Sequence, residues 1–400
     1  MPLPFPAERA AVPLSQRKLV ALDGVRGLAI LAVMCLHARV QPFPLPPVIR
    51  AAFDLGWSGV DLFFVLSGFL ITGILLDSRQ CTNYFRSFYA RRVLRIFPLY
   101  YGFLFLALLA FPYVVPKDFT PARSDGWLCV GYLMNWYGLA RHWHHHILGH
   151  FWSLCVEEQF YLVWPLVVWM VGTRWLLHFV IALELAVLGG RWWWVWHHGA
   201  SQAVTTATIS RMDGLLLGAA AALLMRRFWR TRWSIKPLPS IAALFLSAFV
   251  VGYFRLHHTQ RLLFDESVGY AMLAVGFAAF VLYSAGTDGE PSWQQAGLCW
   301  RPLVLFGKYS YGIYVFHYPL FYFLDELSGR LPPAFHQSLW FGYFFMAFKF
   351  AVAFGVASLS YNFFEKRFLA LKDRFAPVYP EETAAARAES LQPALPLANS

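Results

Sequence analysis

Hydrophobic residues occur along this chain in long, nearly uninterrupted runs. A helix needs about 17–25 mostly apolar residues to cross the hydrocarbon core of a bilayer, and membrane strands would instead show alternating stretches of about ten residues. The pattern therefore predicts an all-α, polytopic integral membrane protein with about ten transmembrane helices. The runs lie at 19–38, 57–76, 96–115, 158–173, 175–190, 207–225, 237–254, 267–285, 302–324 and 339–363.

Composition supports this fold class. Apolar and aromatic residues make up 58% of the chain, charged residues 14%, and the mean hydropathy is +0.48. Soluble globular proteins carry roughly 25% charged residues. These values exclude an ordinary cytosolic enzyme, a disordered protein, a collagen-like repeat and a small disulfide scaffold.

The net charge of +11 comes from Lys and Arg residues that cluster between the apolar runs. With ten spans and both termini in the cytoplasm, 20 of the 33 basic residues lie in inner segments, 9 in outer segments and 4 within spans. This asymmetry follows the positive-inside tendency. It predicts contact with anionic membrane lipid and gives no support to nucleic acid as a partner.

An eleventh apolar segment, 127–139, is too short to span. Counting it as a span would place the basic cluster 226–232 outside, so we expect a re-entrant or interfacial helix. The expected organisation is a cytoplasmic segment 1–18, a transmembrane domain 19–375 and a disordered cytoplasmic tail 376–400.

The first predicted helix carries a polar stripe. Asp23, Arg26 and His37 project from one face, because eleven residues at about 100° each return to within about 20° of the starting direction. Arg26 and His37 differ in height by about 16.5 Å, so the stripe would line a path through much of the membrane. Charges inside a bilayer are costly and often functional. The alternative is a structural Asp–Arg pair with an interfacial histidine.

A second cluster contains Arg92 and Arg95, three residues apart at the inner end of the third predicted span. On one helical turn they point together and could hold a phosphate or pyrophosphate with forked donors. The alternative is an anchor for lipid head groups.

Further polar residues enter the predicted spans. Glu157 precedes the fourth span at the expected depth of His37, where a carboxylate could orient a histidine base; a favourable helix dipole is the alternative. Arg211 lies close to Asp213, and His317 shares a helix face with two other polar residues, although it could be purely structural.

Motifs of other chemistries are absent from the sequence. The histidine-rich run 141–146 lacks the spacing and supporting carboxylate of a zinc site, so no metal is predicted. No G-x-S-x-G, Walker or dinucleotide-binding motif occurs in a suitable context.

Taken together, these clusters resemble the membrane acyltransferase-3 family of integral-membrane O-acyltransferases. The resemblance covers residues 18–370 and rests on seven short motifs in the family's order. They are 22–27 with the spacing of Arg26 and His37, 59–69 containing Asp61, 92–98, 152–161, 211–215, 310–319 and 364–365.

The resemblance implies ten membrane helices in a bacterial-type inner membrane and acyl-CoA as a cytoplasmic donor, with no cofactor. The acceptor would be a sugar hydroxyl of a cell-surface or secreted glycan or glycosylated metabolite, and the acyl group acetyl. Many members carry an additional esterase-like domain, and we expect this chain to belong to the single-domain branch.

The resemblance also assigns site residues. The expected catalytic residues are His37, Glu157, Arg26 and Asp23, with His37 acting as general base or through an acyl-histidine intermediate. The expected substrate-binding residues are Arg92, Arg95, Asp61, Arg211 and His317. The alternative function is a membrane transporter using the same polar stripe, and a lipid-binding scaffold is a third possibility that leaves the stripe unexplained.

Overall fold

Every regular element in the described part of the chain is a helix, so the all-α prediction is confirmed there. The expected segment 1–18, the run 141–146 and residues 381–400 of the expected tail lie outside the described residues. Residues described by the computed structural model are 19–38, 46–110, 113, 126–136, 147–231, 235–332, 335 and 338–380.

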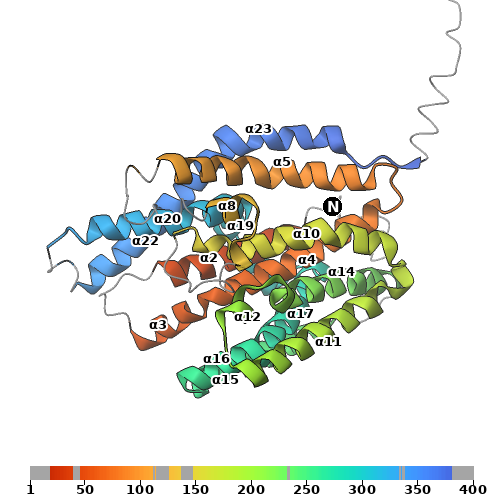
Figure 1. The fold of residues 1–400 in the computed structure, drawn as a ribbon, viewed down its shortest axis with the longest axis horizontal. Helices are drawn as coiled ribbons and strands as arrows, with labels where there is room; N and C mark the ends of the chain where they lie inside the picture. The colour runs from red at the N-terminus through yellow and green to blue at the C-terminus, as the bar shows by residue number, and fades with distance from the viewer. Residues whose placement is uncertain are drawn as a thin grey trace, which may run out of the picture.

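Long helices form a bundle, and each of the ten predicted spans overlaps one of them (Figure 1). Helix α4 is central, because it packs against α2, α10, α14 and α17. The long helices within the described residues are α2 (Val20–His37), α4 (Ser58–Ser78), α5 (Tyr84–Phe105), α10 (Trp152–Met170), α11 (Thr173–His198), α14 (Asp213–Thr231), α15 (Leu238–Arg255), α17 (Tyr270–Gly286), α20 (Ser310–Ser328) and α22 (Leu339–Ser360).

Seven segments of the described chain are both long and apolar enough to cross a membrane. Helices α10, α14 and α20 are not among them, although each has 19 residues. These three helices carry several of the polar side chains that face the interior of the bundle. The chain thus has the character of a multi-pass membrane protein, while ten spans with both termini in the cytoplasm stay a prediction.

Two helices differ in extent from the predicted spans. Helix α5 begins at Tyr84 rather than near residue 96, because Tyr84 and Phe88 are buried against the bundle. Arg92 and Arg95 therefore lie within this helix and not before it. Helix α11 continues past residue 190 to His198, which places Arg191 inside a helix instead of in an outer loop.

Two predicted spans are interrupted. The span 207–225 divides at Met212 into α13 (Thr208–Arg211) and α14, and the span 302–324 divides at Tyr309 into α19 (Arg301–Lys308) and α20. Some backbone hydrogen bonds continue across these positions, since the Tyr309 amide donates to the carbonyl oxygen of Leu305 at 3.1 Å and the Leu216 amide to that of Met212 at 2.8 Å.

The predicted re-entrant segment does not form one helix in its described part. Residues 126–136 contain the short helix α8 (Gly126–Val130) and a 3-10 turn, η4 (Met134–Trp136). The Tyr100 hydroxyl of α5 donates to the carbonyl oxygen of Cys129 at 2.8 Å. Neither element is long enough to cross a bilayer.

Helix α2 packs so closely on α19 that only glycine fits at the contact. A Cβ atom on Gly307 would lie 1.7 Å from the carbonyl oxygen of Asp23, and one on Gly27 would lie 2.1 Å from that of Leu303. Small residues allow membrane helices to approach in this way. The contact fixes the N-terminal half of α2, from which Asp23 and Arg26 project.

We expect Gly307→Ala to destabilise the bundle by about 1–3 kcal/mol, because the added methyl group meets backbone atoms that cannot move aside easily. Gly355→Ala in α22 is the matched control, since a Cβ atom there meets nothing within 4 Å. The measurement is the midpoint temperature of heat-induced aggregation of the detergent-purified proteins. Equal midpoints for the two variants would contradict the close-contact argument.

Candidate active site

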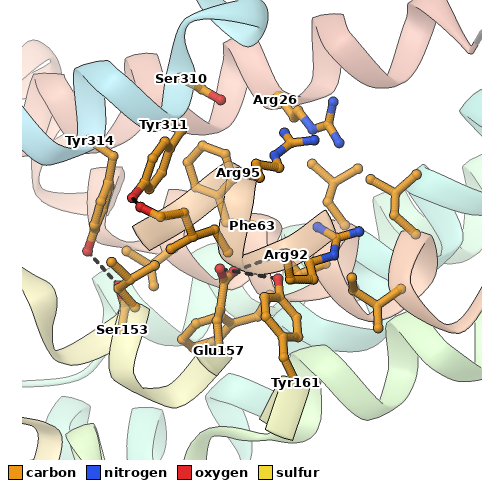
Figure 2. A pocket seen from close by; sticks show the side chains of 18 of the residues that line it. Arg26, Phe63, Arg92, Arg95, Ser153, Glu157, Tyr161, Ser310, Tyr311 and Tyr314 are labelled. Atoms are coloured by element: carbon orange, nitrogen blue, oxygen red, sulfur yellow. Dashed lines mark hydrogen bonds between the residues drawn. The ribbon is translucent and has the colours of Figure 1, made fainter. Parts of the chain in front are cut away.

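A cavity of about 180 Å³, called here the inner cavity, lies among α2, α4, α5, α10 and α20 (Figure 2). Arg26 from α2 and both Arg92 and Arg95 from α5 line it. Arg26 also forms an ion pair with Asp23, with 2.8 Å between Nη1 and Oδ1. Guanidinium groups from two helices thus converge, as phosphate binding requires.

Glu157 and Tyr161 of α10 line another part of the inner cavity, as Figure 2 shows. The Glu157 carboxylate accepts hydrogen bonds from the Ser67 hydroxyl at 2.8 Å and from the Tyr161 hydroxyl at 3.4 Å. The Arg92 guanidinium lies 5.7 Å from the centre of the Tyr161 ring. The inner cavity therefore combines a cationic wall with one hydrogen-bonded carboxylate.

A second cavity of about 420 Å³, the outer cavity, contains His37, the last residue of α2. His37 Nδ1 lies 3.0 Å from Nε2 of His317 on α20, a residue 280 positions away. The ring of His150 also approaches that of His317, with 5.5 Å between centroids. Two residues of the predicted stripe thus line cavities: Arg26 lines the inner cavity and His37 the outer one.

The surroundings of His317 determine the tautomers of both rings. His317 Nδ1 lies 3.0 Å from the carbonyl oxygen of Ile313 and 2.8 Å from that of Tyr314. Carbonyl oxygens only accept, so Nδ1 carries the proton and Nε2 of the neutral ring holds the lone pair. His37 Nδ1 then donates to His317 Nε2, and Nε2 becomes the basic nitrogen of His37.

The structure differs from the expectation that Glu157 orients His37. Glu157 lines the inner cavity and hydrogen-bonds with Ser67 and Tyr161, whereas His37 lines the outer cavity and pairs with His317. The reason is that the face of α10 that carries Glu157 is turned toward α4 and α5. His317 is therefore the residue that positions His37.

Val60 and Tyr314 line both cavities and form the partition between them. The Tyr314 hydroxyl lies 2.5 Å from the Ser153 hydroxyl and also donates to the carbonyl oxygen of His150. These bonds hold the Tyr314 ring across the boundary. Val60 and Tyr314 are thus the residues through which the two cavities adjoin.

Asp61 and Arg211 form a buried ion pair behind the outer cavity. Arg211 Nη2 lies 2.7 Å from Asp61 Oδ1, and the side chains are 2% and 3% exposed. The guanidinium also lies 3.6 Å from the centre of the Tyr270 ring, a cation–π contact. Arg211 lines the outer cavity but Asp61 does not, so Asp61 supports the predicted binding residue from behind.

The role of Arg191 was not predicted from the sequence. Its Nη1 lies 2.7 Å from Asp213 Oδ2 and donates to the carbonyl oxygen of Ser210 at 2.7 Å. The available signal was its position seven residues after Glu184, which places both on one face of a helix. Both residues are buried.

Comparison with known proteins assigns the family. Residues 19–359 match the family profile described as an acyltransferase domain. The chain belongs to the acyltransferase-3 family. The transporter alternative is not favoured by this membership. Among the described residues, no three or more His, Cys, Asp or Glu side chains are grouped so that they could hold a metal ion.

The relatives of this acyltransferase-family chain include named O-acetyltransferases. YrhL of Bacillus subtilis is 29% identical over 373 residues, which are 88% of this chain and 55% of YrhL. O-acetyltransferase OatA of Staphylococcus aureus is 26% identical over 337 residues, with 80% and 53% covered. Peptidoglycan O-acetyltransferase OatA of Listeria monocytogenes is 27% identical over 382 residues, with 88% and 56% covered. The chain spans about half the length of these curated relatives, and no solved structure matches it.

Proposed function

We propose that the chain is an O-acetyltransferase of a bacterial inner membrane that moves an acetyl group from acetyl-CoA to a hydroxyl of a cell-surface or secreted glycan. The acyltransferase family and the names of the relatives support the reaction class. The donor would bind with its phosphates at Arg92 and Arg95, and the acceptor would enter the outer cavity.

One observation carries this proposal: two cavities with different chemistry meet at one partition. The inner cavity gathers guanidinium groups, which suit the phosphates of a CoA ester, and the outer cavity contains an oriented histidine pair. In this scheme the acetyl group would reach past Val60 and Tyr314 toward His37. The two substrates would then meet without either one crossing the whole membrane.

The proposed chemistry is general-base catalysis. His37 Nε2 takes the proton of the acceptor hydroxyl as its oxygen attacks the thioester carbonyl carbon. The C–S bond breaks, and the CoA sulfur takes the proton back from the imidazolium. His317 Nε2 accepts the hydrogen bond from Nδ1–H throughout and so stabilises the charged ring.

We expect Arg92→Lys and Arg95→Lys to raise the KM for acetyl-CoA about tenfold, because Lys keeps the charge but loses the forked donors. Arg91→Lys on the same turn is the matched control, since Arg91 does not line the inner cavity. The measurement is transfer of radiolabelled acetyl groups from acetyl-CoA to peptidoglycan-derived oligosaccharides by the purified chain.

Two results would contradict this scheme. An equal KM in all three lysine variants would remove Arg92 and Arg95 from the donor site. Failure of the unmodified chain to place any label in the oligosaccharides would count against the proposed O-acetyltransferase activity itself.

A further inference from the structure

Three side chains in the wall of the outer cavity carry buried polar atoms without a hydrogen-bond partner among the described residues. These atoms are Oδ1 of Asp265, Nε and Nη1 of Arg211, and both ring nitrogens of His150. Asp265 is 7% exposed and Arg211 2%. Folded proteins leave few buried polar atoms unpaired. A polar ligand bound at this wall would supply the missing hydrogen-bond partners.

Asp265 opens a π-helical turn, η6 (Asp265–Gly269), which directly precedes α17. Such turns are frequent at functional sites. The carboxylate of the adjacent Glu266 already has hydrogen-bond partners. It accepts from the Ser201 amide at 2.8 Å and from the Thr205 hydroxyl at 3.0 Å. Glu266 thus fixes the neighbouring chain, and Asp265 is the carboxylate left for a ligand.

Aromatic rings form much of the remaining wall. Trp57, Tyr253, Tyr270 and Tyr318 all line the outer cavity. The rings of Trp57 and Tyr270 are 5.7 Å apart and nearly perpendicular, which holds the indole in place. Such side chains present an apolar face and a polar tip. A sugar ring has the matching form, with apolar C–H faces and hydroxyl groups at its edge.

The hydrogen-bonding capacity of the Asp265 carboxylate and the Arg211 guanidinium restricts the choice of ligand further. A carboxylate only accepts and a guanidinium only donates. The ligand must therefore offer donors to Asp265 and acceptors to Arg211, and a hydroxyl group does both. Arg261 also lines the cavity, but an anionic group placed beside Asp265 itself would be repelled. An apolar ligand would leave these atoms of Asp265 and Arg211 without a hydrogen bond.

We propose that Asp265 binds adjacent hydroxyl groups of a neutral glycan ring that packs on the aromatic wall. Another hydroxyl of the glycan then faces His37, which lines the same cavity. This inference rests on the proposed function and gives the class of its acceptor: an uncharged sugar ring with neighbouring free hydroxyl groups. Asp265 is the residue that selects for it.

The test measures equilibrium binding of radiolabelled chitotetraose, a neutral oligosaccharide whose terminal ring carries adjacent hydroxyl groups, to the full chain in nanodiscs. Asp265→Asn keeps the shape but loses the charged acceptor, so we expect the Kd to rise about tenfold or more. Glu326→Gln, at an exposed position of α20 away from the cavity, should change the Kd by less than about twofold.

Asp265→Glu separates recognition from folding, because it keeps the carboxylate. We expect it to bind chitotetraose better than Asp265→Asn does. In the transfer assay, Asp265→Asn should raise the KM for chitotetraose more than it lowers kcat, as loss of acceptor binding requires.

Equal chitotetraose binding by the unmodified chain and Asp265→Asn would overturn the inference. Weaker binding by Asp265→Glu than by Asp265→Asn would overturn it as well. These outcomes are distinct from failure of the proposed function, which is judged only by whether the unmodified chain transfers labelled acetyl groups.

Discussion

His37→Ala should reduce acetyl transfer by about 10²–10⁴-fold, the contribution expected of a general base. The hydrogen bond from His37 Nδ1 to His317 leaves Nε2 as the basic nitrogen of His37. His37→Gln should not rescue transfer, because an amide cannot accept and return a proton at neutral pH. Steady-state transfer of label from acetyl-CoA to glycan measures the loss.

Controls separate this catalytic effect from loss of structure. His197→Ala changes an exposed histidine at the end of α11 and should leave the rate unchanged. Both His37 variants should still bind acetyl-CoA, because the inner cavity does not contain His37. Near-normal transfer by His37→Ala would place the base elsewhere, with His150 the next histidine in the outer cavity.

A rapid-quench experiment distinguishes the two chemical routes open to His37. If acetyl-CoA is mixed with the chain in the absence of glycan, label on the protein that disappears in His37→Ala indicates an acyl-histidine intermediate. Label that never appears on the protein indicates direct general-base transfer. Both routes use the same residues and the same partition.

Helical periodicity was sufficient to predict much of this site. The stripe of Asp23, Arg26 and His37 depends only on spacing within one straight helix, and the structure keeps it on α2. The placement of Arg92 and Arg95 in the wall of one cavity is likewise local, because both lie on one turn of α5. Hydropathy also located ten helical regions, because each apolar run had to be buried in the bundle or the membrane.

Contacts between distant segments could not be predicted in this way. The bond between His37 and His317 joins residues 280 positions apart, and it replaced the expected partner Glu157. The helix interruptions at Met212 and Tyr309 were hidden within apolar runs, since hydropathy does not report where backbone hydrogen bonds change. Asp265 could not be identified from the sequence either, because only the folded structure shows that its Oδ1 has no hydrogen-bond partner.

The ion pair of Arg191 and Asp213 lies beside one of these helix interruptions. Arg191 and Asp213 side chains are 0% and 2% exposed. Arg191 also holds the carbonyl oxygen of Ser210, next to the interruption at Met212. The pair thereby supports Arg211, which extends from the same turn into the outer cavity.

Arg191→Leu should lower the stability of the bundle by about 3–5 kcal/mol, because it leaves the Asp213 carboxylate buried without its partner. The double replacement Arg191→Leu with Asp213→Leu should lose less, since no uncompensated charge remains. Arg174→Leu is the matched control at an exposed position of the same helix. The measurement is the fraction of monodisperse protein left after stepwise heating in detergent. If Arg191→Leu survives heating as well as Arg174→Leu, the pair does not hold α11 against α14. Arg211 must then be held in place by Asp61 alone.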